Sequence, residues 1–406
     1  MHFLPILSTL RRHRTAAALI VLEIALTCAI VCNAVFLIRD RLARMDRPSG
    51  VAETELVRVQ VTGIGTEQDA DATTAQDLVV LRAIPGVKSA ALVNMIPFGG
   101  SSWNNGVSAI PDDKPSQVNA ALYMGSEDLL ETFGVNLVAG RDFTADEYSS
   151  FADVQANKAH VPSVIITRGL ADALYPGQNP LGQKLYTWGN DAAIVVGIVD
   201  RLARPNEFQG RAGTEYAMIM PVTMPYTIAS NYVLRVEPGR RAEVLAAVDA
   251  ALDKVDPTRI MLERQTFTDI RHGYFRQDRA MAYLLVGVSI ALLIITALGV
   301  VGLASFWVQQ RTRQIGIRRA LGATRGDILR YFQTENFILV TLGIIVGMGL
   351  AYGINLWLMG TYKVPRLPAE FLPIGAVLLW LLGQIAVLGP ALRASTIPPA
   401  IATRTV

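Results

Sequence analysis

The sequence is poor in the residue types that support thiol and metal chemistry. Two cysteines and four histidines are present among 406 residues. A small secreted domain held together by disulfides is excluded, because such domains need many cysteines. Charged residues make up only 17% of the chain, whereas soluble globular proteins average about 25%. An ordinary cytosolic enzyme is therefore not expected.

The chain also has little net charge. The formal charge of +3 at pH 7 is too weak to predict nucleic-acid binding, and arginines that flank membrane spans account for it equally well. Hydrophobic residues make up 51% of the chain, which excludes an intrinsically disordered protein. We expect the lipid bilayer, and no nucleic acid, as a partner.

The sequence lacks the motifs of common catalytic sites. The histidines are scattered without the spacing of zinc ligands, at His2, His13, His160 and His272, so no metal site is predicted. The loop at 99–106 contains Ser101 and Ser102 but lacks the second glycine of a Gly-x-Ser-x-Gly nucleophile elbow. No Gly-x-x-x-x-Gly-Lys-Ser/Thr motif is present, so no P-loop ATP site is expected. No catalytic residue is predicted.

Four long apolar stretches divide the chain. Each is long enough to cross a hydrocarbon core of roughly 30 Å as a helix that rises about 1.5 Å per residue. The first stretch is too long for the apolar region of a cleaved signal peptide, and we interpret it as a retained anchor. The predicted transmembrane helices comprise residues 15–38, 281–308, 332–360 and 371–392.

Arginines in the connecting segments predict the orientation, because basic residues beside membrane spans are retained in the cytoplasm. The loop at 309–331 carries six arginines and a single aspartate, and is predicted to be cytoplasmic. The basic N-terminal segment 1–14 and the tail 393–406 agree with this orientation. The large segment 39–280 and the short loop 361–370 are then predicted to lie outside the cytoplasm.

The large outer segment is expected to fold as an α+β domain around its own core. Val57, Val59 and Val61 alternate with polar residues, which is typical of a half-buried strand. Further strands are predicted at 87–95, 163–167 and 192–200, and helices at 75–83, capped by Thr73 or Thr74, and 240–255. Their irregular alternation favours α+β layers over a doubly wound parallel sheet.

Polar and small residues inside the spans carry separate predictions. Glu23 is an ionisable residue inside the first predicted span. It could act in a proton relay, or it could form a hydrogen bond with Asn33 or Gln384. A relay would need a second intramembrane carboxylate, and none is identified. Small residues recur at four-residue steps, which predicts close helix packing within one chain or between two, at Gly287, Ala291, Gly343, Gly347 and Ala351.

Cys28 and Cys32 lie four positions apart within the first span. This spacing places both side chains on one face of the helix. Packing as small apolar residues is the favoured interpretation, and redox chemistry is the alternative.

The basic loop contains the most specific sequence pattern in the chain. Residues 311–323 read Arg-Thr-Arg-Gln-Ile-Gly-Ile-Arg-Arg-Ala-Leu-Gly-Ala, and Thr324 and Asp327 have capping-box spacing before the next apolar run. A short helix ending near Gly322 and a second helix starting near Thr324 are therefore predicted. This basic element lies between two spans, and a positive-inside loop without a partner is the alternative interpretation.

This loop resembles the signature of the FtsX-like, MacB-type permeases of type VII ABC transporters, Arg-Thr-Arg-Glu-Ile-Gly-Ile-x-x-Ala-x-Gly-Ala. The sequence departs from it at Gln314, where the family usually has glutamate. The outer segment also resembles the periplasmic core domain of this family in short motifs spread through the chain, at 84–87, 133–143, 173–182 and 196–199. The C-terminal Pro390-Ala391-Leu392-Arg393 is similar too, although the usual Glu-Ala-Leu-Arg ending is replaced at 400–403.

The resemblance implies the permease subunit of a two-permease, two-ATPase assembly in the bacterial inner membrane. It further implies a helical stalk below the outer domain and transmission of ATPase motion to that domain, called mechanotransmission, for substrate export or extraction. No cofactor is expected on this chain, because ATP and Mg would bind a separate ABC ATPase. Other implied partners are a second permease copy, identical or homologous, and a periplasmic adaptor with an outer-membrane channel. The ATPase-coupling residues implied by the loop are Arg313, Gln314, Ile315, Gly316, Ile317, Arg318, Arg319, Ala320, Leu321, Gly322 and Ala323.

Two other functions remain open from the sequence. The first is a signalling subunit, which controls an extracytoplasmic hydrolase or senses peptides without moving cargo. The second is a membrane-tethered enzyme, which would require Ser101 or Ser102 to meet a base.

Overall fold

The computed structural model describes residues 14–62, 69–111, 117–188, 191–207, 213–362 and 366–396. The chain divides into two compact units. The helical unit comprises Met1–Asp46 and Gln277–Val406, and the α+β unit comprises Arg47–Arg276. The predicted basic cluster at 11–13, the histidines His2 and His13 and the ending at 400–403 lie outside the described residues.

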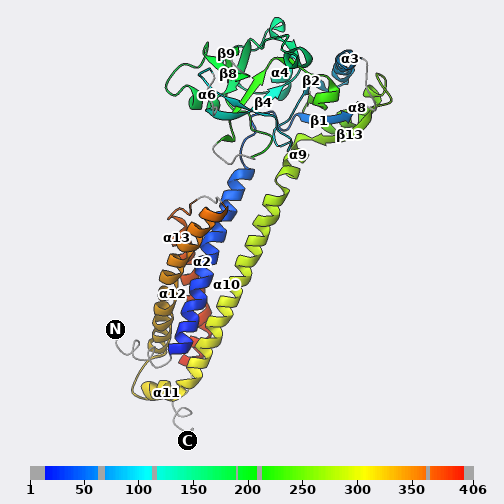
Figure 1. Cartoon of the computed structure of the whole chain (residues 1–406). Helices are drawn as coiled ribbons and strands as arrows, with labels where there is room; N and C mark the ends of the chain where they lie inside the picture. Colours follow the sequence, from blue (N-terminus) through cyan, green and yellow to red (C-terminus); the bar gives the residue numbers. More distant parts are fainter. Residues whose placement is uncertain are drawn as a thin grey trace. The chain divides into compact units, whose positions relative to one another are not determined.

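The helical unit contains long apolar helices joined by a short amphipathic one (Figure 1). Its elements in the described residues are α2 (Arg14–Met45), α10 (Arg276–Gln310), α11 (Thr312–Ala320), α12 (Arg325–Tyr362) and α13 (Phe371–Ser395). Four of these helices, all except α11, are long and apolar enough to cross a membrane. Together with the α+β unit, they confirm the predicted fold class.

Burial differs sharply between these helices. The most apolar window of α2 is 61% buried, because α12 and α13 both pack against this helix. The corresponding window of α10 is only 11% buried, although α10 is the most hydrophobic of the four. The described residues therefore leave most of the apolar surface of α10 uncovered.

The α+β unit contains a four-stranded antiparallel sheet in the order β13-β1-β12-β2. Two β-α-β segments build it: β1 (Leu56–Thr62), α3 (Ala70–Arg82) and β2 (Val87–Val93), then β12 (Asn231–Val236), α8 (Arg241–Leu252) and β13 (Ile260–Thr266). This order and connectivity are those of a ferredoxin-like split β-α-β sheet. The predicted alternation is confirmed, since Val57, Val59 and Val61 are buried in its core.

A second sheet is inserted between β2 and β12. Its path runs β3-β4-β10-β7-β9-β5, with β8 also paired to β9. The strands are β3 (Asn104–Val107), β4 (Val118–Met124), β5 (Leu137–Gly140), β7 (Ser163–Thr167), β8 (Lys184–Trp188), β9 (Asp191–Val199) and β10 (Ala217–Met220). Of these, β7 has the predicted bounds and β9 lies within one residue of them.

The α+β unit also contains several shorter elements. They are α4 (Leu129–Phe133), η1 (Ala145–Glu147), β6 (Ser149–Ser150), α5 (Phe151–Gln155), α6 (Arg168–Leu174), β11 (Val222–Thr223), α7 (Tyr226–Ala229) and α9 (Phe267–Tyr274). Strands β6 and β11 form a small parallel pair.

The start of α3 differs from the sequence prediction. The helix begins at Ala70, and its N-cap is Asp69, whose side chain accepts a hydrogen bond from the backbone N–H of Ala72 at 3.0 Å. Thr74, one of the two predicted caps, lies inside the helix, where its hydroxyl donates to the carbonyl of Ala70. The first helical turn is polar, so apolar periodicity did not reveal it.

Candidate coupling site

The basic loop folds into the short helix α11 between α10 and α12 (Figure 1). Gly322 ends this helix with a φ of +99°, a left-handed conformation that glycine adopts without steric cost. Thr324 and Asp327 then form the predicted reciprocal cap: the Thr324 backbone N–H donates to Asp327 at 2.9 Å, and the Asp327 N–H donates to the Thr324 hydroxyl at 3.2 Å. These end signals fix α11 as a separate helix.

One face of α11 packs into the helical unit. Ile315 is 4% exposed and Gly316 is also buried, in a cluster that α10, α12 and α13 complete with Val308, Ile328, Phe332, Ala391 and Ala394. Ile315 and Gly316 are therefore positioning residues in this structure. Their predicted contact with an ATPase stays a prediction.

The opposite face of α11 and its C-terminal end are exposed. Leu321 is 83% exposed and Ile317 is 45% exposed, so both large apolar side chains are open to a partner. The other predicted coupling residues that are exposed are Arg313, Gln314, Arg318, Ala320 and Gly322, whereas Arg319 and Ala323 are half-buried. The exposed residues of α11 and its C-terminal end therefore combine large apolar side chains with arginine charges.

A buried ion pair joins the start of α11 to α12. The N-cap residue Arg311 donates hydrogen bonds from Nη1 to both carboxylate oxygens of Glu335, at 3.0 and 2.7 Å. Both side chains are nearly inaccessible, with 8% and 2% exposed. The Arg311 guanidinium also lies over the ring of Trp307 on α10, 5.5 Å from its centroid. This cluster ties α10, α11 and α12 together.

Glu335 is a second carboxylate inside a predicted span, and it was not identified from the sequence. It lies within the predicted span 332–360, close to the basic loop, where an acidic residue resembles an ordinary helix end. The available signal was a carboxylate inside a predicted span, which needs a basic partner such as an arginine of the neighbouring loop. The pairing of Glu335 with Arg311 satisfies both charges and provides no sign of a proton relay.

The intramembrane polar residues of α2 contact two neighbouring helices. The Glu23 carboxylate lies against Gly299 of α10, where an added Cβ would be 2.5 Å from its nearer oxygen. The hydroxyls of Thr27 and Thr296 are 2.8 Å apart. The amide of Asn33, proposed above as a partner of Glu23, donates instead to the carbonyls of Ala29 and Ala351 at 3.0 Å.

The small residues of α12 lie where α12 meets α2. A Cβ at Gly343 would lie 2.7 Å from Ile24, and one at Gly347 would lie 2.5 Å from the Cβ of Cys28. Ala351 is fully buried. Gly287 and Ala291 of α10 are instead exposed, so contacts within the described chain do not use them.

The ends of α2 and α10 that extend beyond the predicted spans are joined by charge. Asp278 accepts hydrogen bonds from Arg41 at 2.5 Å and from Arg44 at 3.3 Å. Asp278 is only 8% exposed, so its charge is compensated in a desolvated position. These contacts join the ends of α2 and α10 within the helical unit, and the stalk that the resemblance implied stays a prediction.

The serine loop contains no nucleophile paired with a base in the described contacts. The Ser102 hydroxyl donates to the side-chain carbonyl of Asn104 at 3.0 Å, and an amide oxygen cannot act as a general base. Within the described ranges, no group of three or more His, Cys, Asp and Glu side chains has the arrangement of a metal site.

Comparison with known families gives two matches in chain order. The MacB-like periplasmic core domain matches residues 17–251, and the FtsX-like permease C-terminal domain matches residues 286–399. The first match alone covers more than half of the chain.

Individual relatives are similar over part of their length. A macrolide export ATP-binding/permease protein MacB from Chromobacterium violaceum is 26% identical over 59% of this chain and 36% of that protein. An uncharacterized ABC transporter permease YknZ from Bacillus subtilis is 26% identical over 66% of each chain. The matched region thus spans about a third of the length of the MacB proteins.

Among solved structures, the periplasmic region of MacB from Actinobacillus actinomycetemcomitans aligns with 57% of this chain and 97% of its own length. The sequences are 14% identical and the TM-score is 0.34, which is too low for residue-by-residue comparison.

Proposed function

The chain belongs to the MacB/FtsX-like ABC transporter permeases, and from this premise we propose that it couples ATP hydrolysis by a partner ATPase to motion of its α+β unit. The observation that carries the proposal is α11, an amphipathic helix bound to both neighbouring long helices. Arg311 and Glu335 hold its start, and Leu321 is exposed at its end. A force applied to such an element passes into α10 and α12 rather than being absorbed by a flexible loop.

Mechanotransmission explains the composition of the long helices better than a hydrated channel does. The apolar window of α10 has a mean hydropathy of 2.8, and those of α12 and α13 have values of 2.3 and 2.2. Side chains that line an aqueous path are polar or charged, because an unpaired ion in an apolar environment is costly. We therefore propose that substrate is handled by the outer domain during export or extraction.

The partners of this assembly follow from the same proposal. The partner ABC ATPase would bind ATP and Mg, and it would contact the exposed face of α11. The uncovered surface of α10 would contact lipid and a second permease copy, identical or homologous. In a bacterium with two membranes, the chain would lie in the inner membrane, and a periplasmic adaptor and outer-membrane channel would complete the export path. A signalling subunit would transmit ATPase motion through the same helices, but no observation in this chain favours a signalling function.

A topology measurement tests the proposal most directly. Cys28 and Cys32 are buried and are the only cysteines, so their replacement by alanine gives a background for single-cysteine labelling. Leu321→Cys and Ala152→Cys then report on α11 and the α+β unit respectively. A membrane-impermeant maleimide applied to intact spheroplasts should label position 152 and spare position 321 until the membrane is opened. Labelling of position 321 in intact spheroplasts would contradict the proposal.

A second measurement tests the ATPase partner. The full chain should co-purify with the ABC ATPase encoded beside it, and the pair in nanodiscs should hydrolyse ATP at a rate that depends on the permease. An ATPase rate unchanged by the permease would contradict the coupling. Genes for an adaptor in the same neighbourhood would favour export, and genes for a histidine kinase or hydrolase would favour signalling.

A further inference from the structure

The inserted sheet of the α+β unit closes on itself. Its path starts at β3 and reaches β9, to which β8 is paired. Ser108, just after β3, forms an antiparallel bridge with Tyr186 of β8, with backbone hydrogen bonds of 3.0 and 2.9 Å. This bridge joins β8 to the β3 end of the path, so β3, β4, β10, β7, β9 and β8 form a ring of strands, with β5 paired to β9 outside this ring.

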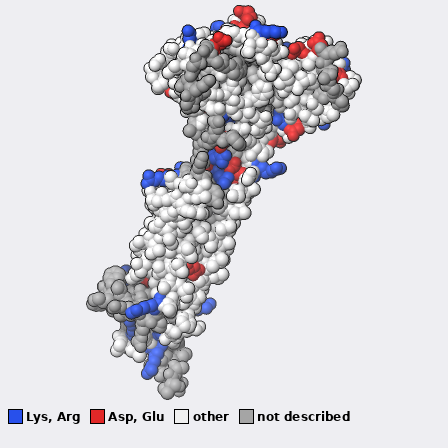
Figure 2. Space-filling model, viewed as in Figure 1, with Lys and Arg blue, Asp and Glu red and all other residues white. Residues whose placement is uncertain are grey.

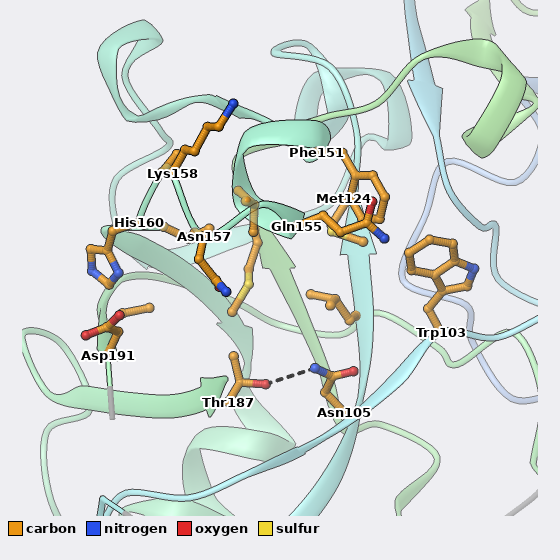
Figure 3. Close-up of a pocket in the computed structure, with 16 residues that line it drawn as sticks. Trp103, Asn105, Met124, Phe151, Gln155, Asn157, Lys158, His160, Thr187 and Asp191 are labelled. Atoms are coloured by element: carbon orange, nitrogen blue, oxygen red, sulfur yellow. Dashed lines mark hydrogen bonds between the residues drawn. The ribbon is translucent and has the colours of Figure 1, made fainter. Parts of the chain in front are cut away.

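Alternate side chains of this ring point to a common apolar interior. Successive residues of a strand face opposite sides, so the buried core members of each strand share one face. They are Val107, Ala120, Leu122, Met124, Val164, Ile166, Leu185, Ala193, Val195, Met218 and Met220. At one end of the ring this interior opens into a cavity of about 590 Å³ (Figure 3).

The floor of the cavity is apolar and adaptable. Met124 and Met220 lie there with Leu122, and methionine side chains adjust their shape to irregular ligands. Trp103 and Phe151 form one wall, with ring centroids 5.7 Å apart in an edge-to-face arrangement. The volume falls within the range of about 300–1,000 Å³ that is usual for small-molecule sites.

Neutral polar groups stand above this floor. The Asn105 amide donates to the Thr187 hydroxyl at 3.4 Å (Figure 3). The Thr187 hydroxyl donates in turn to the carbonyl of Gly106, also at 3.4 Å. These are long, weak hydrogen bonds, which a ligand can replace at small cost. Gln155, exposed at the end of α5, adds a second amide at the rim.

The charged groups at the cavity offset one another. Lys158 and Asp191 carry opposite charges, and Figure 3 shows the Lys158 side chain extending away from the floor. His160 lies beside Asp191 at the outer edge (Figure 3). A charged ligand would lose hydration in the apolar interior without a dedicated counter-charge, which is unfavourable.

We propose that the mouth of this strand ring binds a neutral amphiphilic small molecule, with its apolar body on Met124 and Met220 and its polar end at Asn105 and Thr187. This inference depends on the α+β unit alone. It stays testable whether or not the chain couples to an ATPase.

The test uses the full chain in nanodiscs and the neutral fluorophore 6-propionyl-2-dimethylaminonaphthalene, whose emission shifts to the blue in apolar surroundings. A saturable component above empty nanodiscs is expected. Gln155→Phe, which fills the mouth from an exposed position, should weaken the apparent affinity by about tenfold, since it removes room for the ligand. The matched control is Ala152→Phe, because Ala152 is also exposed on α5 but does not line the cavity. Equal effects of the two variants would overturn the proposal.

Two further measurements test the charge of the ligand and its polar contact in the cavity. The anionic probe 1-anilinonaphthalene-8-sulfonate should bind at least about tenfold more weakly, because the interior offers no counter-charge. If the anionic probe bound as tightly as the neutral fluorophore or more tightly, the proposal of a neutral ligand would be overturned. Thr187→Val keeps the side-chain volume but removes the hydroxyl. Its affinity for the neutral fluorophore tests the site if Gln155→Phe fails to fold. An unchanged affinity in Thr187→Val would then contradict the proposed polar contact.

Discussion

Arg311 and Glu335 form an almost fully desolvated ion pair between the start of α11 and α12, with both carboxylate oxygens accepting hydrogen bonds from one guanidinium nitrogen. The pair lies beside the apolar cluster that holds Ile315. Its effect is to fix the orientation of α11, whose exposed face is the proposed ATPase contact. The charge pair and the apolar cluster act together, so α11 should move as one body with α12.

Glu335→Gln should destabilise the helical unit by about 3–5 kcal/mol, because it leaves the buried Arg311 charge without a counter-ion. The midpoint of thermal unfolding of the detergent-solubilised chain measures the effect. The double variant Arg311→Met/Glu335→Leu should recover most of the lost stability, since it removes both charges. Equal destabilisation of the single and double variants would show that packing, and not charge, holds the site.

Leu321→Asp should uncouple the permease from ATPase stimulation while leaving its stability within about 0.5 kcal/mol, because Leu321 is 83% exposed. Ile315→Asp is the contrasting variant, since that residue is buried and an unpaired carboxylate there should destabilise the unit. ATPase rate and thermal midpoint are measured side by side. Unchanged stimulation in Leu321→Asp would remove this residue from the proposed contact.

Gly347→Val should separate α12 from α2, because a side chain at 347 would meet the Cβ of Cys28 and the carbonyl oxygen of Ala25, 2.7 Å away. A loss of about 1–3 kcal/mol is expected from overpacking. The control is Gly349→Val, on the same helix, where nothing lies within 4 Å. Comparable losses in both variants would indicate a general effect of valine in this helix rather than a close helix contact.

Asp77→Asn should destabilise the α+β unit by about 3–5 kcal/mol, because it removes the buried counter-charge of Arg259 and leaves only the longer ion pair with Asp256, at 3.5 Å. The two side chains are 0% and 4% exposed, and the Tyr232 hydroxyl also donates to Asp77. The exposed pair of Asp249 and Arg264 provides the control, for which Asp249→Asn should cost about 0–1 kcal/mol. Thermal unfolding of the full chain resolves the difference.

Hydrogen bonds from Arg141 lower the pKa of Glu147 to about 2. Its pKa in the unfolded chain is about 4.3, so the folded state favours the ionised carboxylate. The resulting stabilisation is present above that unfolded pKa and is lost as the pH falls through the folded value, between about pH 4.3 and pH 2. The stability difference between the wild type and Glu147→Gln should therefore shrink across this window. A difference independent of pH would contradict the assignment.

The sequence predicts those features that depend on local pattern. The apolar runs predict the long helices, and the alternation of Val57, Val59 and Val61 predicts β1. The pairing of Thr324 with Asp327 needs only a spacing of three residues, so its capping box is also predictable. These features require no knowledge of which distant segments meet.

Contacts between residues far apart in the sequence could not be predicted from local pattern. Glu335 lies 24 residues beyond Arg311, and no local pattern joins them. The cavity requires Trp103, Met220 and Thr187 to meet at one end of a ring, which depends on strand pairing across the whole insertion. The burial of Ile315 beside the exposed Leu321 depends on how α13 returns to the loop. Each of these needs the tertiary fold.

The inserted module leaves and re-enters the ferredoxin-like sheet at neighbouring positions, because Val93 at the end of β2 is paired with Asn231 at the start of β12. Two chain ends that already meet can carry a different module without rebuilding the strands below. We therefore expect replacement of residues 94–230 to change ligand preference, while the long helices proposed to transmit ATPase motion stay the same. A chimera that exchanges this segment for that of a relative would keep its ATPase response and acquire the relative's ligand.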